Sequence, residues 1–239
     1  LPTHVIENKF WFLRLLFLRS GIENLLNITC KRYFMELIKT IRTIKNIIYI
    51  YKINNELFAF KPSNEVEKEI LANKLAKLFN IKTLKIKPFE INQKRGILMD
   101  YLEDATLLTH YKKRLDKNKI KQLKRIILFD IWIGNKDRHT GNILVDDDLI
   151  AFDHDDIFQK NRARNFVKLD IGRKLIEDYA GIIEKLLDKD LTVVQVLEKL
   201  GFTKQDFIDI KEEDIRKIVE DKNLVSFLLS RKYFNKIKF

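Results

Sequence analysis

The sequence predicts an α+β fold in two lobes, with a small β-rich N-terminal lobe and a larger, mostly helical C-terminal lobe. β-rich apolar runs occupy residues 46–61, whereas residues 118–133 and much of the chain after residue 160 show apolar positions at helical spacing. The chain has 239 residues, 46% of them hydrophobic, which is enough for a sizeable core. Because no Ser/Gly-rich linker interrupts it, we expect one continuous unit, divided into an N-terminal helical extension of uncertain status (residues 1–34), the N-terminal lobe (35–103) and the C-terminal lobe (104–239).

The predicted N-terminal lobe begins with two strands, residues 46–53 and 56–61, joined by Asn54 and Asn55. Asn tolerates positive φ, so this pair indicates a hairpin turn. Lys61 ends the second strand, and a helix with a cap at Ser63 or Asn64 is expected to follow. Its apolar stripe consists of Val66, Ile70, Leu71, Leu75 and Leu78. Residues 97–103 read as a further strand that runs into a polar turn.

The predicted C-terminal lobe begins with an amphipathic helix over residues 118–133, which ends at Gly134 as a C-terminal cap. A hairpin follows, with a strand at 142–145, a turn at 146–148 and a returning strand at 149–152 that ends on Asp153. Apolar spacing then predicts a helical tail, with helices over residues 174–187, 192–200, 204–210, 212–219 and 224–234.

Composition narrows the functional classes. The single cysteine, Cys30, excludes an intramolecular disulfide and a Cys-based zinc cluster, and is typical of a reducing, cytoplasmic location. The apolar segment at residues 10–19 contains Arg14 and is too short to span a membrane, so we expect no membrane span. The net charge of +12 comes mostly from lysines that are spread along the chain among acidic residues. It therefore predicts at most a weak nucleic-acid contact through a basic surface.

The hairpin region carries the most informative spacing. Asn142 follows Asp137 by five positions, which is the Asp-x-x-x-x-Asn spacing of a kinase catalytic loop. The hairpin is expected to bring Asn142 and Asp153 together as two oxygen ligands for Mg²⁺. Asp137 lies just before the hairpin, where it could orient or deprotonate an attacking hydroxyl.

Residues 134–142, Gly-Asn-Lys-Asp-Arg-His-Thr-Gly-Asn, resemble the catalytic segment of the HipA-like kinases and, more distantly, of the phosphatidylinositol 3- and 4-kinases. In both families an Asp-Arg-His or similar triplet carries the catalytic Asp, in the inverse order to the His-Arg-Asp of ordinary protein kinases. The resemblance is specific over residues 125–158 and weaker from about residue 45 to the C-terminus. It implies a bilobal protein-kinase-like fold with Asp137 as the catalytic residue.

The resemblance also implies how ATP is held. Lys61 would neutralise the α- and β-phosphates, and Glu69 on the following helix would fix Lys61. Glu65 and Glu67 compete for that role, but Glu69 lies beside the core positions of the helix. Backbone groups of Asp100, Tyr101 and Leu102 would hydrogen-bond adenine at a hinge. No Gly-rich loop precedes Lys61, so backbone near residues 40–45 is expected to cover the phosphates instead.

Supporting roles follow for neighbouring residues. Arg138 and His139 are expected to position the loop or contact phosphate, Asp130 to hold loop backbone or Arg138, and His154 to be a satisfied buried histidine.

These expectations define a Mg²⁺- and ATP-dependent phosphotransferase of the HipA-like type, acting on a hydroxyl acceptor such as a protein Ser/Thr. Three alternatives remain open at this point: a lipid or small-molecule kinase, a pseudokinase that binds ATP as a structural ligand, and a nucleic-acid-binding factor. The intact set of Asp137, Asn142 and Asp153 argues against the pseudokinase, and the missing Gly-rich loop argues for it.

Overall fold

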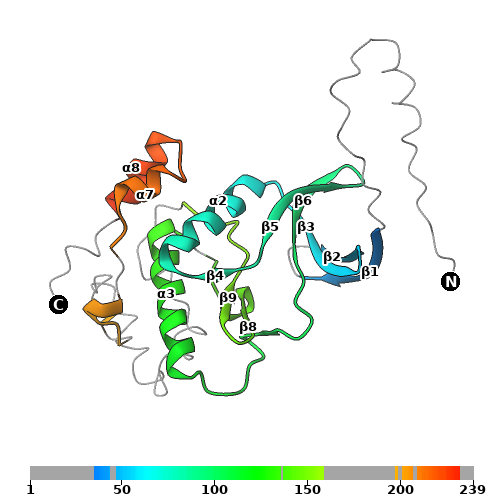
Figure 1. Cartoon of the computed structure of the whole chain (residues 1–239), viewed down its shortest axis with the longest axis horizontal. Helices are drawn as coiled ribbons and strands as arrows, with labels where there is room; N and C mark the ends of the chain where they lie inside the picture. The colour runs from blue at the N-terminus through cyan, green and yellow to red at the C-terminus, as the bar shows by residue number, and fades with distance from the viewer. Residues whose placement is uncertain are drawn as a thin grey trace, which may run out of the picture. The chain divides into compact units, whose positions relative to one another are not determined.

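Five strands between residues 35 and 100 form an antiparallel sheet in the order β1-β2-β3-β6-β5 (Figure 1). The strands are β1 (Met35–Arg42), β2 (Ile47–Ile53), β3 (Glu56–Pro62), β5 (Ile86–Ile91) and β6 (Lys94–Asp100). The computed structural model describes residues 35–43, 47–135, 137–158, 197–198, 201–206 and 209–231. The apolar segment at residues 10–19 and the predicted helix at 174–187 lie outside the described residues, as does most of the predicted helix at 192–200.

The β2–β3 hairpin is the one that the sequence predicts. Asn54 and Asn55 take φ values of 51° and 70°, the left-handed conformation that the hairpin turn requires. Asn92 and Gln93 use the same conformation to join β5 to β6. The strand predicted at residues 97–103 corresponds to the second half of β6, which pairs with β3 in the middle of the sheet.

Helix α2 (Val66–Ala76) follows β3, but its N-terminus differs from the prediction. Glu65 is the N-cap residue, and its side chain makes no capping hydrogen bond. The Ser63 hydroxyl instead accepts a hydrogen bond from the Glu65 amide at 3.0 Å. The reason is that the chain is still joined to the sheet at Ser63, whose amide donates to the Arg95 carbonyl, so the helix begins later.

The long helix α3 (Lys117–Ile133) agrees with the prediction at both ends. Asp116 caps its N-terminus by accepting from the Lys119 amide, and Gly134 ends it with a φ of 70°. The second half of α3 is buried around its whole circumference. Phe79 from the 3₁₀ turn η1 (Lys77–Phe79) packs there, with ring centroids 5.3 Å from Phe129 and 5.2 Å from Trp132. These three rings belong to the largest apolar core among the described residues.

A second, four-stranded sheet has the order β4-β9-β8-β7. Its strands are β7 (Thr106–Leu107), β8 (Ile143–Val145), β9 (Leu149–Ala151) and β4 (Lys82–Thr83), which pairs parallel to β9. The β8–β9 pair is the hairpin predicted at residues 142–152. Because β4 belongs to the segment assigned to the N-terminal lobe, this sheet ties the two predicted segments together. The α+β class is confirmed, and the division into two lobes stays a prediction.

The C-terminal elements within the described residues are short. They are η4 (Lys204–Asp206), α7 (Glu212–Arg216) and α8 (Lys222–Ser230). The helix predicted at 204–210 is a 3₁₀ turn over its first three residues, and α7 and α8 fall within or near the other two predicted segments. Trp132 of α3 donates its indole N–H to the Leu228 carbonyl of α8 at 3.1 Å. In the part of the chain that the structure describes, no helix is long and apolar enough to cross a membrane.

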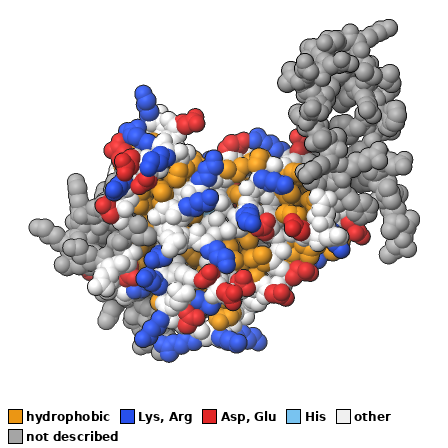
Figure 2. All heavy atoms as spheres, viewed as in Figure 1, with side chains coloured by type: hydrophobic (Ala, Val, Ile, Leu, Met, Phe, Trp, Pro, Cys, Tyr) orange, Lys and Arg blue, Asp and Glu red, His pale blue; other side chains and the backbone are white. Residues whose placement is uncertain are grey.

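Charge is mixed over the surface. On the face shown in Figure 2, Lys and Arg side chains are interspersed with Asp and Glu side chains and do not gather into one basic patch. The large exposed apolar side chains of the described residues lie instead on β1 and at the start of β2: Met35, Leu37, Ile38, Ile41 and Ile47. The nucleic-acid contact that net charge suggested gains no support from this face.

One glycine is required by close approach of two strands. Gly96 of β6 lies opposite Pro62 at the end of β3. A Cβ atom at position 96 would collide with the Lys61 carbonyl oxygen and would lie 2.8 Å from the Phe60 ring. Gly96 therefore allows β3 to place Lys61 where it does.

We predict that Gly96→Ala lowers the free energy of unfolding by about 1–3 kcal/mol, the usual cost of overpacking a close-packed site. Urea unfolding followed by circular dichroism measures this. Lys94→Ala in the same strand is the control, because Lys94 is exposed and surface substitutions usually change stability by less than about 0.5 kcal/mol. Equal stability of the two variants would contradict the close-approach argument.

Candidate active site

Lys61 and Glu69 form a buried ion pair between the central sheet and α2. Lys61 is near the end of β3, and Glu69 lies one turn into α2 on the face that carries Val66 and Ala72. The Lys61 ammonium is 2.8 Å from the Glu69 carboxylate, and each side chain is only 5% exposed. Glu67, on the other side of the helix, is exposed and pairs with Arg95.

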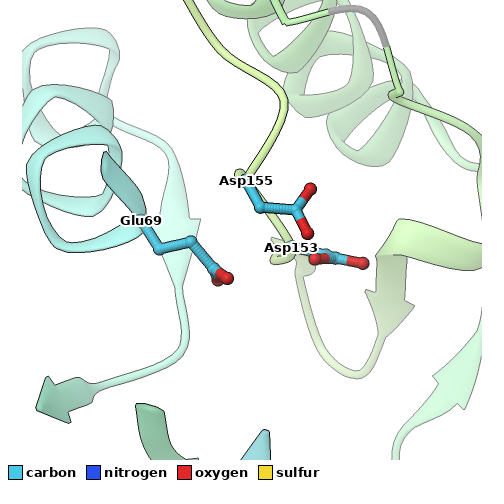
Figure 3. Close-up of side chains that lie close together, drawn as sticks. All are labelled: Glu69, Asp153 and Asp155. Atoms are coloured by element: carbon cyan, nitrogen blue, oxygen red, sulfur yellow. The ribbon is translucent and has the colours of Figure 1, made fainter. Parts of the chain in front are cut away.

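Two further carboxylates meet the same ammonium. Lys61 contacts Asp153 directly and Asp155 at 3.1 Å. Carboxylate oxygens of Glu69, Asp153 and Asp155 all lie within 4.8 Å of one another. Figure 3 shows Glu69 reaching from its helix toward the loop that carries the two aspartates. The structure thus brings together Lys61, Glu69 and Asp153, three of the residues that the sequence predicted for the site.

Asp155 is the residue that the sequence analysis missed. The available signal was the alternation Asp153-His154-Asp155, because alternate residues of an extended chain point to the same side. Asp153 itself has a φ of 59°. A positive φ is uncommon for a non-glycine residue and tends to occur at functional positions, where the surrounding contacts hold it.

Excess negative charge dominates the electrostatics of this cluster. Burial alone would lower the pKa of Lys61, but the nearby carboxylates of Glu69 and Asp153 outweigh burial and raise that pKa above its usual value. Burial raises the pKa of Glu69 to about 7, against the opposing attraction of Lys61. Three carboxylates around one ammonium leave two surplus negative charges when all are ionised. Oxygen ligands with a surplus of negative charge are the donor set that Mg²⁺ prefers, so the residues fit this ion.

Arg138 is fully buried and anchors the loop that follows α3. Its guanidinium donates to the Asp130 carboxylate at 2.8 Å and 3.3 Å, and neither side chain is exposed. The same group donates to the backbone carbonyls of Asn142 at 2.7 Å and Phe152 at 2.6 Å. Burial raises the pKa of Asp130 despite the opposing attraction of Arg138. Arg138 thereby joins the end of α3 to both strands at the base of the β8–β9 hairpin.

Asn135 and Asn142 hold Asp137 in place from either side. The Asn135 side chain donates to the Asp130 carboxylate at 2.8 Å and accepts from the Asp137 amide at 3.1 Å. The side-chain amide nitrogen of Asn142 donates to the Asp137 backbone carbonyl at 2.9 Å. This bond orients the carboxamide and leaves its oxygen with no hydrogen-bond partner among the described residues. Asn142 also accepts from the Phe152 amide through its backbone carbonyl, beside Asp153.

The two histidines of this region have structural surroundings. His139 precedes the turn η2 (Thr140–Asn142), and its Nδ1 accepts from the Gly141 amide at 3.0 Å. His154 is 3% exposed and packs edge-on against Phe129. Burial lowers the pKa of His154 well below its usual value, with Arg138 and Lys61 adding to the effect. Its Nε2 is buried and has no hydrogen-bond partner in the described part of the chain, so these residues do not supply the partner that the sequence led us to expect.

The predicted hinge is only partly available for a ligand. The Asp100 amide donates to the Lys85 carbonyl and the Tyr101 amide to the Leu57 carbonyl, each at 3.2 Å. Neither amide is free to bind adenine, whereas the Leu102 amide has no hydrogen-bond partner among the described residues. The Tyr101 hydroxyl accepts from Lys39 of β1 at 2.7 Å. Of the segment expected to cover the phosphates, residues 40–42 belong to β1, and residues 44–45 lie outside the described residues.

Comparison with known proteins identifies relatives of this chain. A family model described as phosphatidylinositol 3- and 4-kinase matches residues 22–190, which is more than half of the chain. Among solved structures, the crystal structure of a Helicobacter pylori proinflammatory kinase CtkA is similar, with 13% identity and a TM-score of 0.44. That match covers 85% of this chain and 93% of the other. Comparison with curated proteins found no match. The resemblance to HipA-like kinases stays a prediction.

We predict that Arg138→Met lowers the free energy of unfolding by about 3–5 kcal/mol, because it leaves the Asp130 carboxylate buried without its cation. Chemical denaturation measures the change. Arg95→Met is the matched control, since it breaks an ion pair that lies on the surface, and should have little effect. The single variant Asp130→Asn and the double variant Asp130→Asn/Arg138→Met complete the test. If the double variant loses as much unfolding free energy as the two single variants added together, the two side chains are not coupled, which contradicts the prediction.

Proposed function

The chain belongs to the phosphatidylinositol 3- and 4-kinase family, and from this premise we propose that it is a phosphotransferase that uses Mg²⁺-ATP and transfers the γ-phosphate to a hydroxyl group. The observation that carries the proposal is the buried pair of Lys61 and Glu69 facing Asp153. Lys61 and Glu69 are eight residues apart, on a strand and the helix that follows it, whereas Asp153 comes from a loop 92 positions after Lys61. A lysine fixed by a glutamate and set against an acidic metal ligand is the arrangement that kinases use to hold ATP phosphates.

Each residue of the cluster has a separate proposed role. Lys61 would neutralise phosphate charge, and Glu69 would keep Lys61 in place through their ion pair. Asp153, Asp155 and the side-chain oxygen of Asn142 would hold Mg²⁺, which offsets the charge that the phosphates add. Leu102 presents the backbone amide that supports adenine binding at the hinge. Arg138 and His139 position the loop and do not contact substrate.

Asp137 acts on the acceptor. Its carboxylate takes the proton from the attacking hydroxyl while the hydroxyl oxygen forms the new bond to the γ-phosphorus. The bond between that phosphorus and the oxygen bridging to the β-phosphate breaks, and ADP leaves with the electron pair. The Asp137 amide donates to the Asn135 side chain, and the Asp137 carbonyl accepts from the Asn142 side chain. These bonds support this role, because they fix the loop before substrate binds.

Two classes of acceptor fit the proposal. The likeness of residues 134–142 to the HipA-like kinases favours a protein Ser/Thr hydroxyl, whereas the family match favours the hydroxyl of an inositol lipid. An ATP-binding pseudokinase is the second candidate function. It is favoured by the connection between β1 and β2, because no glycine lies between Gly21 and Gly96 to form a Gly-rich loop.

We predict that Asp137→Asn lowers the phosphotransfer rate by about 10²–10⁴-fold, because the amide keeps the shape of the side chain but cannot accept the proton. ATP affinity and melting temperature should stay nearly unchanged. Radiolabelled ATP is the donor, and protein, phosphatidylinositol and autophosphorylation are tested as acceptors. A wild-type rate in the variant removes Asp137 from the chemistry. Mg²⁺-dependent ATP binding without turnover on any acceptor supports the pseudokinase.

We also predict that Asp155→Ala weakens Mg²⁺-dependent ATP binding by at least tenfold, since it removes one of three clustered carboxylates. ATP affinity is measured by isothermal titration with and without Mg²⁺. Asp147→Ala is the matched control, because Asp147 is exposed in the β8–β9 turn, and should leave both affinities unchanged. If Asp155→Ala binds Mg²⁺-ATP as the unsubstituted protein does, Asp155 has no part in holding the ion.

A further inference from the structure

A cavity of about 520 Å³ opens between three elements that the proposed active site does not use. It lies among the end of η1 and the start of β4, the first half of α3, and the turn between β8 and β9. Ile81, Ile126 and Leu149 line it and are buried. The remaining lining residues are polar or charged. None of the lining residues belongs to the Lys61 cluster or to the loop around Asp137.

Basic side chains dominate the charge of this cavity. Lys121 and Arg125 lie four residues apart on α3 and therefore on the same helix face. Lys82 joins them from β4. Among the described residues, no group forms a hydrogen bond or an ion pair with the side chain of Lys121 or of Arg125. Two cations thus border a cavity without a counterion from this part of the chain.

The single acidic residue of the cavity is already engaged. Asp148 accepts from the Gln122 side chain at 2.6 Å and lies 3.5 Å from the Lys82 ammonium. Gln122 in turn accepts from the Leu149 amide at 2.8 Å. Because Lys82 offsets the charge of Asp148, the charges of Lys121 and Arg125 remain as surplus. The Gln122 bonds also fix the cavity wall on the side of the hairpin turn.

We propose that this cavity binds the phosphate group of a small soluble ligand, at a site separate from that of ATP. The planar guanidinium of Arg125 can donate two parallel hydrogen bonds to phosphate oxygens, and Lys121 adds a point charge one helical turn away. Asn80 and Asn118 at the rim supply neutral donors. The cavity volume is in the range of small-molecule sites.

A soluble ligand fits the surroundings of the cavity better than a lipid headgroup. A membrane-bound ligand would need apolar surface beside the cavity to contact acyl chains. The large exposed apolar residues in the described part of the chain all lie on β1 and at the start of β2. The lining residues at the cavity rim are polar: Asn80, Lys82, Asn118 and Lys121.

The test is a titration of the full chain with inorganic phosphate at constant ionic strength, with chloride as the balancing anion and calorimetry as the readout. Lys121→Gln/Arg125→Gln should bind phosphate at least tenfold more weakly, since each lost charge-assisted hydrogen bond costs that much or more. Lys112→Gln/Lys113→Gln removes the same charge from exposed positions outside the cavity and should bind as the unsubstituted protein does. Lys82→Gln is a second cavity variant with a smaller expected loss.

The outcomes separate this site from the proposed active site. Lys61→Met should retain phosphate binding, and loss of binding in that variant would place the phosphate at the Lys61 cluster and overturn the proposal. An equal loss in the two double variants would mean general attraction to a basic protein, which also overturns it. Glycerol 3-phosphate should compete with inorganic phosphate. Binding to vesicles that contain phosphatidylinositol 4-phosphate, without binding of either soluble probe, would contradict a soluble ligand.

Discussion

The buried ion pair between Arg138 and Asp130 is the interaction on which the proposed active site depends. Removing two charges from water is costly, and such a pair is tolerated only when further hydrogen bonds satisfy the remaining donors and acceptors. Here they are satisfied: Asn135 donates to Asp130, and two backbone carbonyls accept from Arg138. Because those carbonyls belong to Asn142 and to Phe152, which precedes Asp153, a single guanidinium fixes the backbone of one proposed metal ligand of the hairpin and of the residue next to another.

In the Lys61 cluster, by contrast, positive and negative charges do not cancel. Three carboxylates share one ammonium, and Asp153 and Asp155 remain partly exposed. Burial is the main cause of the raised pKa of Glu69, and the charges of Asp153 and Asp155 add to it. A site that is satisfied by its own residues needs no ligand, whereas a surplus of negative charge is relieved by a cation. The contrast distinguishes a structural ion pair at Arg138 from the proposed binding site at Lys61.

Local patterns predicted the elements of this fold better than the contacts between them. Asn54-Asn55, Gly134 and the phase of Glu69 on its helix are signals within a few residues, and the structure has the corresponding turn, helix end and ion pair. Asp155 was missed because the catalytic-loop spacing and the hairpin pattern pointed only to Asp153, and the contact of Asp155 with Lys61, 94 positions away, arises only in the folded chain. The same holds for the parallel pairing of β4 with β9 and for the occupied amides of Asp100 and Tyr101. Spacing in the sequence does not show which hydrogen-bonding groups, far apart along the chain, are already paired with each other in the fold.

The β8–β9 hairpin links these observations physically. Each of its strands has three residues, so its own ladder contributes few hydrogen bonds and would be marginal in isolation. Side chains from neighbouring elements hold it at both ends instead, Arg138 at the base and Gln122 at the turn. Both come from α3 or the loop after it, so the helix sets the position of the whole hairpin. Asp153 lies two residues after the end of β9, which packs against α3. The same helix therefore also fixes where the chain enters the loop that carries Asp153 with its positive φ.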